Sequence, residues 1–321
     1  MFSDDEAADE IGRTIRLVRD FWHDDAFPYF LVTLQPFDQD HGSSDGTAFT
    51  DAFWMDVSRK DNINGLLSQL AHESFHAWNP LKMGYLSTKE YERSKWFKEG
   101  FTEYYAQKLT YAGGELSATK LVTSINKDLL AFPSSSSEYI RGRIIALWLD
   151  AAIRQESHGK HSLDTVMFRM VHDRKQSLTE QRIFATVAPY VSAETLTLLK
   201  QAADQQGNLP APQTAPGLGD CYHASHGDFP SFDLGLDYKS SRTTKAIVGV
   251  EPSGPAFHEG LRDGQPLVAS TFDRDDPNKL AIFTVGIDGK EKQISFKPLG
   301  HSVTAWQIHS RFRLATLRLS E

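Results

Sequence analysis

The chain of 321 residues is long enough for one large domain or two modest ones, and we expect two. Hydrophobic residues make up 40% and charged residues 24%, globular proportions that exclude a chain that is disordered or coiled-coil throughout. The net charge of −8 disfavours a nucleic-acid-binding protein. The single cysteine, Cys221, excludes an internal disulfide and a cysteine-rich metal site, so any metal ligand must be His, Asp or Glu.

The first ten residues form an acidic tail, which lacks the basic and apolar regions of a signal peptide. No apolar run approaches the roughly 18 residues needed to span a bilayer. We therefore expect no membrane span and a cytoplasmic location, or a periplasmic or secreted one if a leader was removed.

The composition divides the rest of the chain into three parts. Residues 11–204 are rich in helical patterns and carry the aromatic and histidine-bearing segments. Residues 205–219 contain three prolines, three glycines and no charge, which is typical of a linker. Residues 220–321 contain short β-like runs separated by turns. The expected fold class is therefore α+β, with a mainly helical domain followed by a small β-rich one.

Two runs in the C-terminal part, 245–250 and 280–285, predict strands. Asp288 and Gly289 stand where a hairpin turn is expected.

A helix over residues 63–78 is predicted by an N-cap at Asp61 or Asn62 and by apolar residues that recur at three- and four-residue spacing. His72 and His76 fall together on the side opposite the apolar arc, with Glu73 at its edge. Because four residues make about one turn, both imidazoles can reach one Zn²⁺ at ~2.0 to 2.1 Å, and Glu73 can bond water on the metal. The alternative is a surface helix with two unrelated histidines.

A second helix is predicted over residues 96–105, with Glu99 and Glu103 one turn apart on one face. Glu99 can be the third zinc ligand, since two neutral imidazoles and one carboxylate leave an open position where the pKa of bound water falls toward ~7. Glu103 can accept the free N–H of His72 and so fix its tautomer. Both glutamates are equally typical of a solvated helix surface.

These segments resemble the glycyl aminopeptidase family of gluzincin metallopeptidases. The likeness rests on residues 72–80 and 96–105, and on later segments in the same order: Tyr139-Ile-Arg-Gly142, the helix 144–154 and residues 159–164. It covers about residues 11–299.

The resemblance implies a thermolysin-like catalytic domain and one Zn²⁺ per chain on His72, His76 and Glu99. It also implies that Glu73 is the general base and that Tyr139 donates a hydrogen bond to the developing oxyanion. From the residues alone, a tyrosine ahead of a helix is more often a packing residue.

Two departures from the family bear on aminopeptidase specificity. Family members hold the substrate's ammonium group with a glutamate on a strand before the zinc helix, but no Glu occurs here between Glu10 and Glu73. Asp45 or Asp51 would have to substitute. The N-terminal β domain of the family is also absent from this sequence.

Family members carry a C-terminal PDZ domain, and residues 253–264 resemble the PDZ signature. The resemblance makes Leu234, Gly235 and Leu236 the candidate loop that would cap the C-terminus of a bound peptide with backbone N–H groups. The alternative is that Gly235 only permits a turn.

The predicted function is zinc-dependent hydrolysis of peptide bonds, by an aminopeptidase that removes small N-terminal residues such as Gly or Ala. The alternatives are a zinc endopeptidase of altered specificity and an inactive scaffold that binds peptides through the PDZ-like domain. The sequence contains no Gly-x-Ser-x-Gly elbow, so a serine hydrolase has no support.

Overall fold

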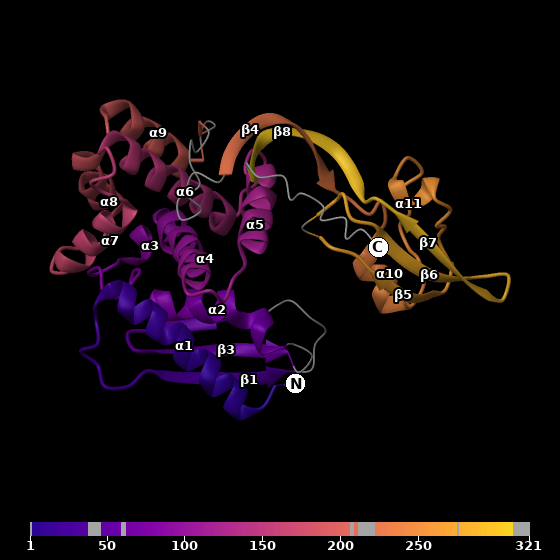
Figure 1. Ribbon diagram of the computed structural model, residues 1–321, viewed down its shortest axis with the longest axis horizontal. Coiled ribbons are helices and arrows are strands. Elements are labelled where there is room, and N and C mark those ends of the chain that lie inside the picture. Colours follow the sequence, from indigo (N-terminus) through magenta and orange to yellow (C-terminus); the bar gives the residue numbers. More distant parts are fainter. Residues whose placement is uncertain are drawn as a thin grey trace, which may run out of the picture. The chain divides into compact units, whose positions relative to one another are not determined.

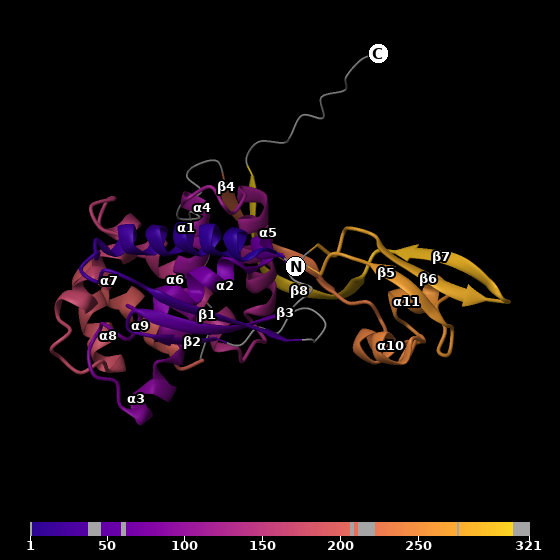
Figure 2. The same ribbon diagram turned by 90° about the horizontal axis from the view of Figure 1, so that it is seen from below.

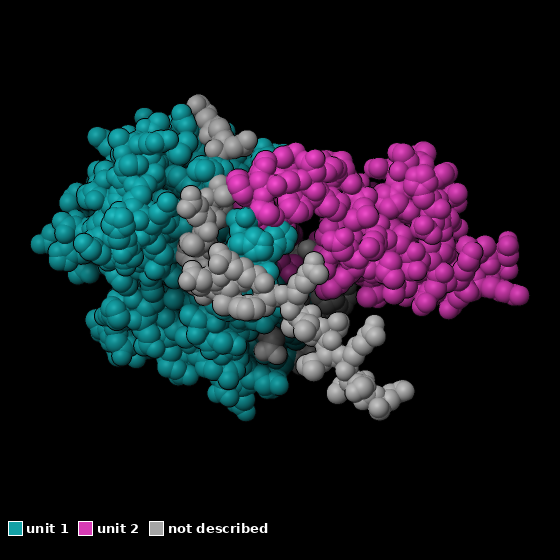
Figure 3. Space-filling view, turned by 45° about the horizontal axis from the view of Figure 1, so that its top comes forward, with its two compact units in different colours: residues 1–122, 131–224, 308–321 teal, residues 123–130, 225–307 magenta. Residues whose placement is uncertain are grey.

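The computed structural model describes residues 2–37, 46–58, 62–205, 209–210, 222–274 and 276–310. The chain divides into two compact units, shown in separate colours in Figure 3. The first unit comprises residues 1–122, 131–224 and 308–321, and the second comprises residues 123–130 and 225–307. Among the described residues, no helix has both the length and the apolar character that crossing a membrane requires.

The described elements up to residue 203 are, in chain order, α1 (Asp4–Trp22), β1 (Leu31–Phe37), β2 (Gly46–Phe49), β3 (Ala52–Ser58), α2 (Ile63–His76), α3 (Thr88–Arg93), the π-helix η1 (Trp96–Phe101), α4 (Thr102–Ala112), α5 (Ala118–Ala131), α6 (Glu138–Glu156), α7 (Leu163–His172), α8 (Glu180–Val187), the 3₁₀ turn η2 (Ala188–Tyr190) and α9 (Ala193–Ala203).

Helix α1 begins inside the stretch that was expected to be an acidic tail. Ser3 caps it, accepting a hydrogen bond from the Glu6 N–H while the Glu6 carboxylate accepts one from the Ser3 N–H. Asp4 and Asp5 lie in the first turn, where negative charge is stabilised by the helix dipole. The expected tail is therefore wrong for most of its length, because its acidic residues favour a helix start.

A three-stranded sheet of order β1-β3-β2 lies against α1 and α2. Strand β3 is parallel to β1 and antiparallel to β2, so β2 is an edge strand. Phe53, Met55 and Val57 alternate along β3 and pack in one core with Ala7 of α1 and Leu66 of α2. Figure 2 shows α1 lying along one face of this sheet.

Helix α2 lies between the sheet and the remaining helices of the first unit (Figure 1). It starts as predicted, with the Asn62 side chain accepting a hydrogen bond from the Gly65 N–H at 2.8 Å. Phe75 is fully buried and stacks on Tyr105 of α4, with ring centroids 4.9 Å apart. The helix is therefore packed on both sides, and its two histidines face the interior of the unit.

The predicted helix 96–105 is present as η1 followed by α4. A π-helix is rare and appears mostly as a single turn at functional sites. It packs against α6 through two glycines: a Cβ on Gly100 would lie 2.1 Å from the Gly142 Cα, and one on Gly142 would lie 1.9 Å from the Trp96 carbonyl oxygen. Only glycines permit this contact, which sets η1 beside the first turns of α6.

The described elements from residue 222 onward are β4 (Tyr222–Phe232), α10 (Tyr238–Thr244), α11 (Pro255–His258), β5 (Leu267–Thr271), β6 (Ala281–Ile287), β7 (Lys290–Phe296) and β8 (Leu299–Ser310). β4 pairs with β8, and β5, β6 and β7 form an antiparallel sheet.

Two sequence predictions in this part have different outcomes. The hairpin is present, because Asp288 and Gly289, with φ of 50° and 74°, join β6 to β7. The strand predicted over 245–250 is wrong, since the segment forms only an isolated bridge between Ala246 and Pro266. Ile247 is nevertheless fully buried, so the apolar run reflects burial rather than a strand.

Candidate active site

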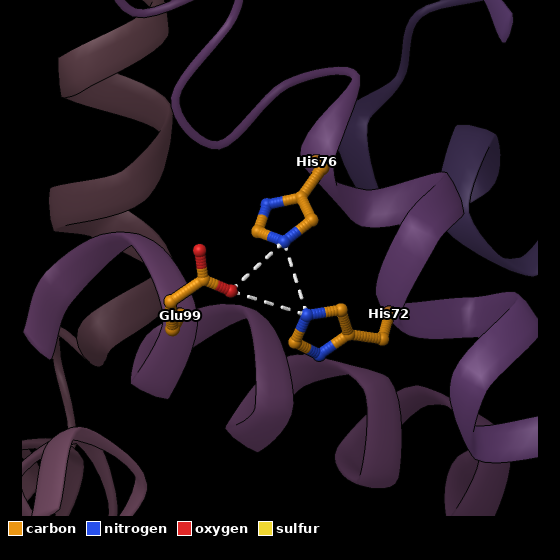
Figure 4. Close-up of side chains that lie close together, drawn as sticks. All are labelled: His72, His76 and Glu99. Carbon is orange, nitrogen blue, oxygen red and sulfur yellow. Dashed lines mark hydrogen bonds and ion pairs between the residues drawn. The ribbon is translucent and has the colours of Figure 1, made fainter. Parts of the chain in front are cut away.

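Three donor atoms from two segments converge inside the first unit (Figure 4). His72 and His76 stand one turn apart on α2, and their Nε2 atoms lie 3.0 Å from each other. The Glu99 Oε2 of η1 lies 3.4 Å from the His72 Nε2 and 3.2 Å from the His76 Nε2. All three residues are buried.

The outer nitrogen of each imidazole has its own hydrogen-bond partner. His76 Nδ1 lies 2.8 Å from the main-chain oxygen of Asn79, and His72 Nδ1 lies 3.1 Å from the Glu103 Oε2. A carbonyl and a carboxylate oxygen can only accept, so both Nδ1 atoms carry the proton. When both imidazoles are neutral, two Nε2 lone pairs and a carboxylate oxygen therefore face one another.

A positive charge among the three donors is favourable, because the Glu99 carboxylate is buried there in its ionised form. Burial lowers the pKa of His76. Burial would also lower the pKa of His72, but hydrogen bonds to Glu103 and Glu99 raise it to about 9. Burial alone would raise the pKa of Glu99, yet the two imidazoles and Lys98 hold it far below its usual range, so the carboxylate is ionised.

The donor geometry fits zinc. Ligands about 2.0 to 2.1 Å from a tetrahedral Zn²⁺ lie roughly 3.3 Å from one another. The three observed separations, 3.0, 3.2 and 3.4 Å, bracket that value. No other group of His, Cys, Asp or Glu with metal-ligand spacing occurs among the described residues.

Glu103 lies where the sequence prediction puts it, next to His72. Its Oε1 accepts a hydrogen bond from the Gln107 Nε2 at 2.7 Å, and Gln107 in turn accepts one from Arg143. Burial would raise the pKa of Glu103, but His72 and Arg143 lower it to about 2. The carboxylate therefore stays charged and holds one tautomer of His72.

A cavity of about 570 Å³ opens beside the three donors. Its wall combines the edge strand β2, the metal-facing side of α2, the turn after α2 and the start of α6. The lining residues are Gly46, Thr47, Ala48, His72, Glu73, His76, Pro80, Leu81, Gly84, Tyr85, Leu86, Tyr91, Lys98, Glu99 and Tyr139.

Glu73 lies on the wall of this cavity and is 7% exposed. Strand β2 approaches it so closely that a Cβ on Gly46 would lie 2.4 Å from the Glu73 carboxyl carbon. A glycine at the start of β2 therefore leaves room for the carboxylate beside the donor group.

Tyr139 reaches the cavity from the first turn of α6, and its side chain is half exposed. Its ring stacks on that of His72 with centroids 5.7 Å apart. Partial burial and the nearby Glu99 raise the pKa of Tyr139 well above its ordinary value. The phenol is therefore a hydrogen-bond donor at neutral pH.

Of the two predicted substitutes for the amine anchor, the structure describes one. Asp51 does not line the cavity and instead pairs with Lys82 at 3.0 Å. Asp45 lies outside the described residues.

The predicted peptide-binding loop lies in the second unit. Gly235 has φ of 66°, as a tight turn requires, but its N–H donates to the Asp233 carboxylate at 2.7 Å. The chain continues as the helix α10 and not as a strand. One of the donors expected to cap a peptide carboxylate is thus already used.

Two residues near the donors had no role in the sequence analysis. Lys98 pairs with the Glu99 Oε1 at 2.6 Å and lines the cavity. Asn79 contacts both metal-facing segments. Their only signal in the sequence is that they follow or precede a predicted ligand by one to three positions, which many surface residues also do.

Comparisons with known proteins agree with this site. Residues 65–143 match the family model of the M61 glycyl aminopeptidases, the family that the motifs of this sequence resemble. This segment contains the three donors, Glu73 and Tyr139. No curated protein gives a significant match.

One solved structure has a similar fold. An aminopeptidase N family protein from Idiomarina loihiensis matches with a TM-score of 0.64 and 15% identity over 97% of this chain and 65% of its own. An M1 zinc metallopeptidase from Deinococcus radiodurans matches with a TM-score of 0.45 and 19% identity over 63% of this chain and 46% of its own. The chain thus spans about two thirds of the first protein and less than half of the second.

Proposed function

We propose that this chain is a zinc metallopeptidase of the M61 glycyl aminopeptidase type, whose family model matches residues 65–143. The observation that carries the proposal is the convergence of His72, His76 and Glu99 on one point at zinc-ligand separations, at the edge of an open cavity. We propose that it releases small N-terminal residues, Gly or Ala, from peptides.

The described residues can act on the scissile carbonyl, the attacking water and the leaving amine of a bound peptide. Zinc bound by the three donors would act as a Lewis acid on the scissile carbonyl and lower the pKa of water. Glu73 lies beside them with its carboxylate at the cavity wall, where it can take the proton of the attacking water and pass it to the leaving amine.

Tyr139 also lines the cavity, as a protonated phenol. Its hydroxyl can donate a hydrogen bond to the carbonyl oxygen as negative charge develops there. A donor held near Glu99 and His72 is already oriented before the substrate binds.

The edge strand β2 favours a peptide as the substrate. β2 pairs with β3 on one side only, and Gly46, Thr47 and Ala48 line the cavity. An extended peptide can add to such an edge through main-chain hydrogen bonds, which recognise a backbone irrespective of its side chains.

One observation favours a zinc endopeptidase as the second candidate. Among the described residues that line the cavity, the carboxylates are Glu73 and Glu99, and both belong to the reaction centre. The remaining charged lining residue, Lys98, would repel a substrate ammonium group. An endopeptidase has no need to bind that group.

Hydrolysis of matched free and N-acetylated alanyl and glycyl peptides separates these candidates. The aminopeptidase proposal predicts cleavage of the free peptide and loss of at least a hundredfold in kcat/KM for the blocked one. Equal cleavage of both identifies an endopeptidase. Cleavage of neither by the zinc-loaded protein contradicts both and leaves the peptide-binding scaffold. Glu73→Gln protein serves as the blank for contaminating peptidases.

A further inference from the structure

We infer that Asn79 is a positioning residue that ties together the two segments carrying the metal ligands. The inference rests on the proposed zinc site but concerns a residue outside the donor set. Asn79 is fully buried in the turn after α2, between His76 and Glu99 in the chain. It contacts both segments through different groups.

Its main chain serves the first segment. The Asn79 carbonyl oxygen accepts the hydrogen bond from His76 Nδ1 at 2.8 Å. This bond turns the His76 ring so that its Nε2 faces the Nε2 of His72 and the Glu99 carboxylate. Any residue at position 79 can supply this carbonyl.

Its side chain serves the second segment. The Asn79 Nδ2 donates to the carbonyl oxygens of Phe97 and Lys98, each at 3.3 Å, and to the Thr102 Oγ1 at 3.1 Å. These acceptors lie on both sides of Glu99 in the chain. The amide thus holds the backbone of the π-helix from which the third donor projects.

The roles of the two amide atoms are unequal. Main-chain carbonyls can only accept, so the NH₂ group must face Phe97 and Lys98. The Asn79 Oδ1 is buried and has no hydrogen-bond partner in the part of the chain that the structure describes. Since a buried unpaired oxygen is unfavourable, the side chain contributes here through its donors.

Thr102 extends the same link. Its hydroxyl oxygen accepts from the Asn79 Nδ2 and lies 3.4 Å from His76 Nδ1. Asn79 and Thr102 therefore form a bridge from the α2 imidazole to the segment around Glu99. A fixed frame behind the three donors keeps the distances that zinc requires.

The test is a double-mutant cycle read out as zinc affinity, measured by competition with a chromophoric chelator. In Asn79→Ala the carbonyl to His76 remains and the clamp on η1 is lost. We expect the zinc Kd to rise about tenfold to a hundredfold, the usual range for residues that orient metal ligands. In the Glu99→Ala background the same change should raise the Kd by less than about threefold, because the donor it positions is gone.

A second pair of variants guards against misfolding of Asn79→Ala. Thr102→Val removes the bridging hydroxyl, and Thr110→Val removes a buried hydroxyl of the same helix that donates to carbonyls of its own turn. Both should lower the apoprotein Tm by similar amounts. Only Thr102→Val should weaken zinc binding.

The outcomes separate this inference from the zinc site itself. Failure of the wild-type protein to bind zinc contradicts the proposed function. Wild-type binding together with unchanged affinity in folded Asn79→Ala, an equal loss in the Glu99→Ala background, or equal affinity of the two threonine variants overturns the positioning role alone.

Discussion

At the scale of single residues, Tyr139 differs from a packing tyrosine in what surrounds its hydroxyl. The ring is only half buried, against His72, and the nearby Glu99 carboxylate helps keep the phenol protonated. A packing residue contributes through its ring, whereas an oxyanion donor contributes through its hydroxyl. Removing the hydroxyl alone separates the two roles.

Tyr139→Phe should therefore lower kcat about 10²-fold or more, as loss of one oxyanion donor does elsewhere. KM and zinc content should stay close to wild type. Steady-state kinetics with metal analysis measures all three, and Tyr29→Phe, an exposed phenol outside the cavity lining, is the control. An unchanged kcat in Tyr139→Phe would show that Tyr139 acts only through packing of its ring.

The residues of the site differ in how far the sequence could predict them. The periodicity of an α-helix is enough to place His72 beside His76, since four residues make one turn. The approach of Glu99 depends on how η1 packs against α6, which no local pattern contains, so the residues alone left Glu99 as one of two readings. Asn79 was missed because its contacts cross from one segment to another.

At the scale of elements, the crossing of η1 and α6 decides where Tyr139 stands relative to Glu99. Gly142 lies one turn after Tyr139, and Gly100 is the neighbour of Glu99. The backbones meet at these two glycines, so the crossing distance is set by the absence of side chains. The two functional groups are thereby brought to the same cavity wall.

Gly142→Ala should therefore destabilise the protein by about 3 kcal/mol or more, because overpacking adds to a clash with main-chain atoms. Gly12→Ala is the matched control: its Cβ would meet only the end of Arg16 at 3.7 Å, and alanine favours the helix by about 1 kcal/mol. Urea unfolding measures both. Equal stability of the two variants would contradict the close crossing.

Asp24 connects the end of α1 to the turn after α2. Trp78 Nε1 and Lys82 Nζ donate to its Oδ2 at 2.8 and 3.1 Å. Burial alone would raise the pKa of Asp24, but these hydrogen bonds lower it below the ordinary value. A lowered pKa means that the folded state favours the ionised carboxylate.

The stabilisation by Asp24 should be full above the pKa of the unfolded state, roughly 3.9, and should disappear as pH falls through the lower folded pKa. Asp24→Asn should cost about 1 kcal/mol at neutral pH. Urea unfolding at neutral pH and at successively lower pH measures the difference. A difference that stays constant, or grows as the pH falls, would contradict the sign.

Element boundaries followed from the sequence where a local signal decides them. Asn62 fixes the start of α2, and Asp288-Gly289 fixes the turn between β6 and β7. The acidic N-terminus and the run 245–250 were misjudged, because the same residues suit a helix start or a buried loop when tertiary packing provides partners.

At the scale of the whole molecule, tryptophan fluorescence can follow one of the two compact units. All tryptophans except Trp306 lie in the first unit, which also carries the proposed zinc site. Tryptophan fluorescence therefore reports mainly on the unit that zinc should stabilise.

Removing zinc with a chelator should lower the Tm of the fluorescence transition by several degrees, since a ligand at 1,000 times its Kd stabilises by about 4 kcal/mol. Re-addition of zinc should restore it. His72→Ala should show the low Tm with and without zinc. A chelator effect of equal size in that variant would place the stabilising metal elsewhere.

The mixture of helix and strand could be anticipated from the sequence, whose composition also led us to expect two domains. The assignment of two short segments could not be anticipated. Residues 123–130 within α5 belong to the second unit, and residues 308–310 at the end of β8 belong to the first. Such assignments follow from long-range pairing, which a change in composition does not reveal.

The most direct measurement of the central claim is zinc content and turnover of wild type beside Glu73→Gln. Both proteins should bind one zinc per chain, because Glu73 is not among the converging donors. Only the wild type should hydrolyse alanyl and glycyl peptides, with the variant at least about 100-fold slower. Equal turnover of the two proteins would show that Glu73 is not the base. A wild type that binds no zinc would contradict the zinc site of His72, His76 and Glu99 itself.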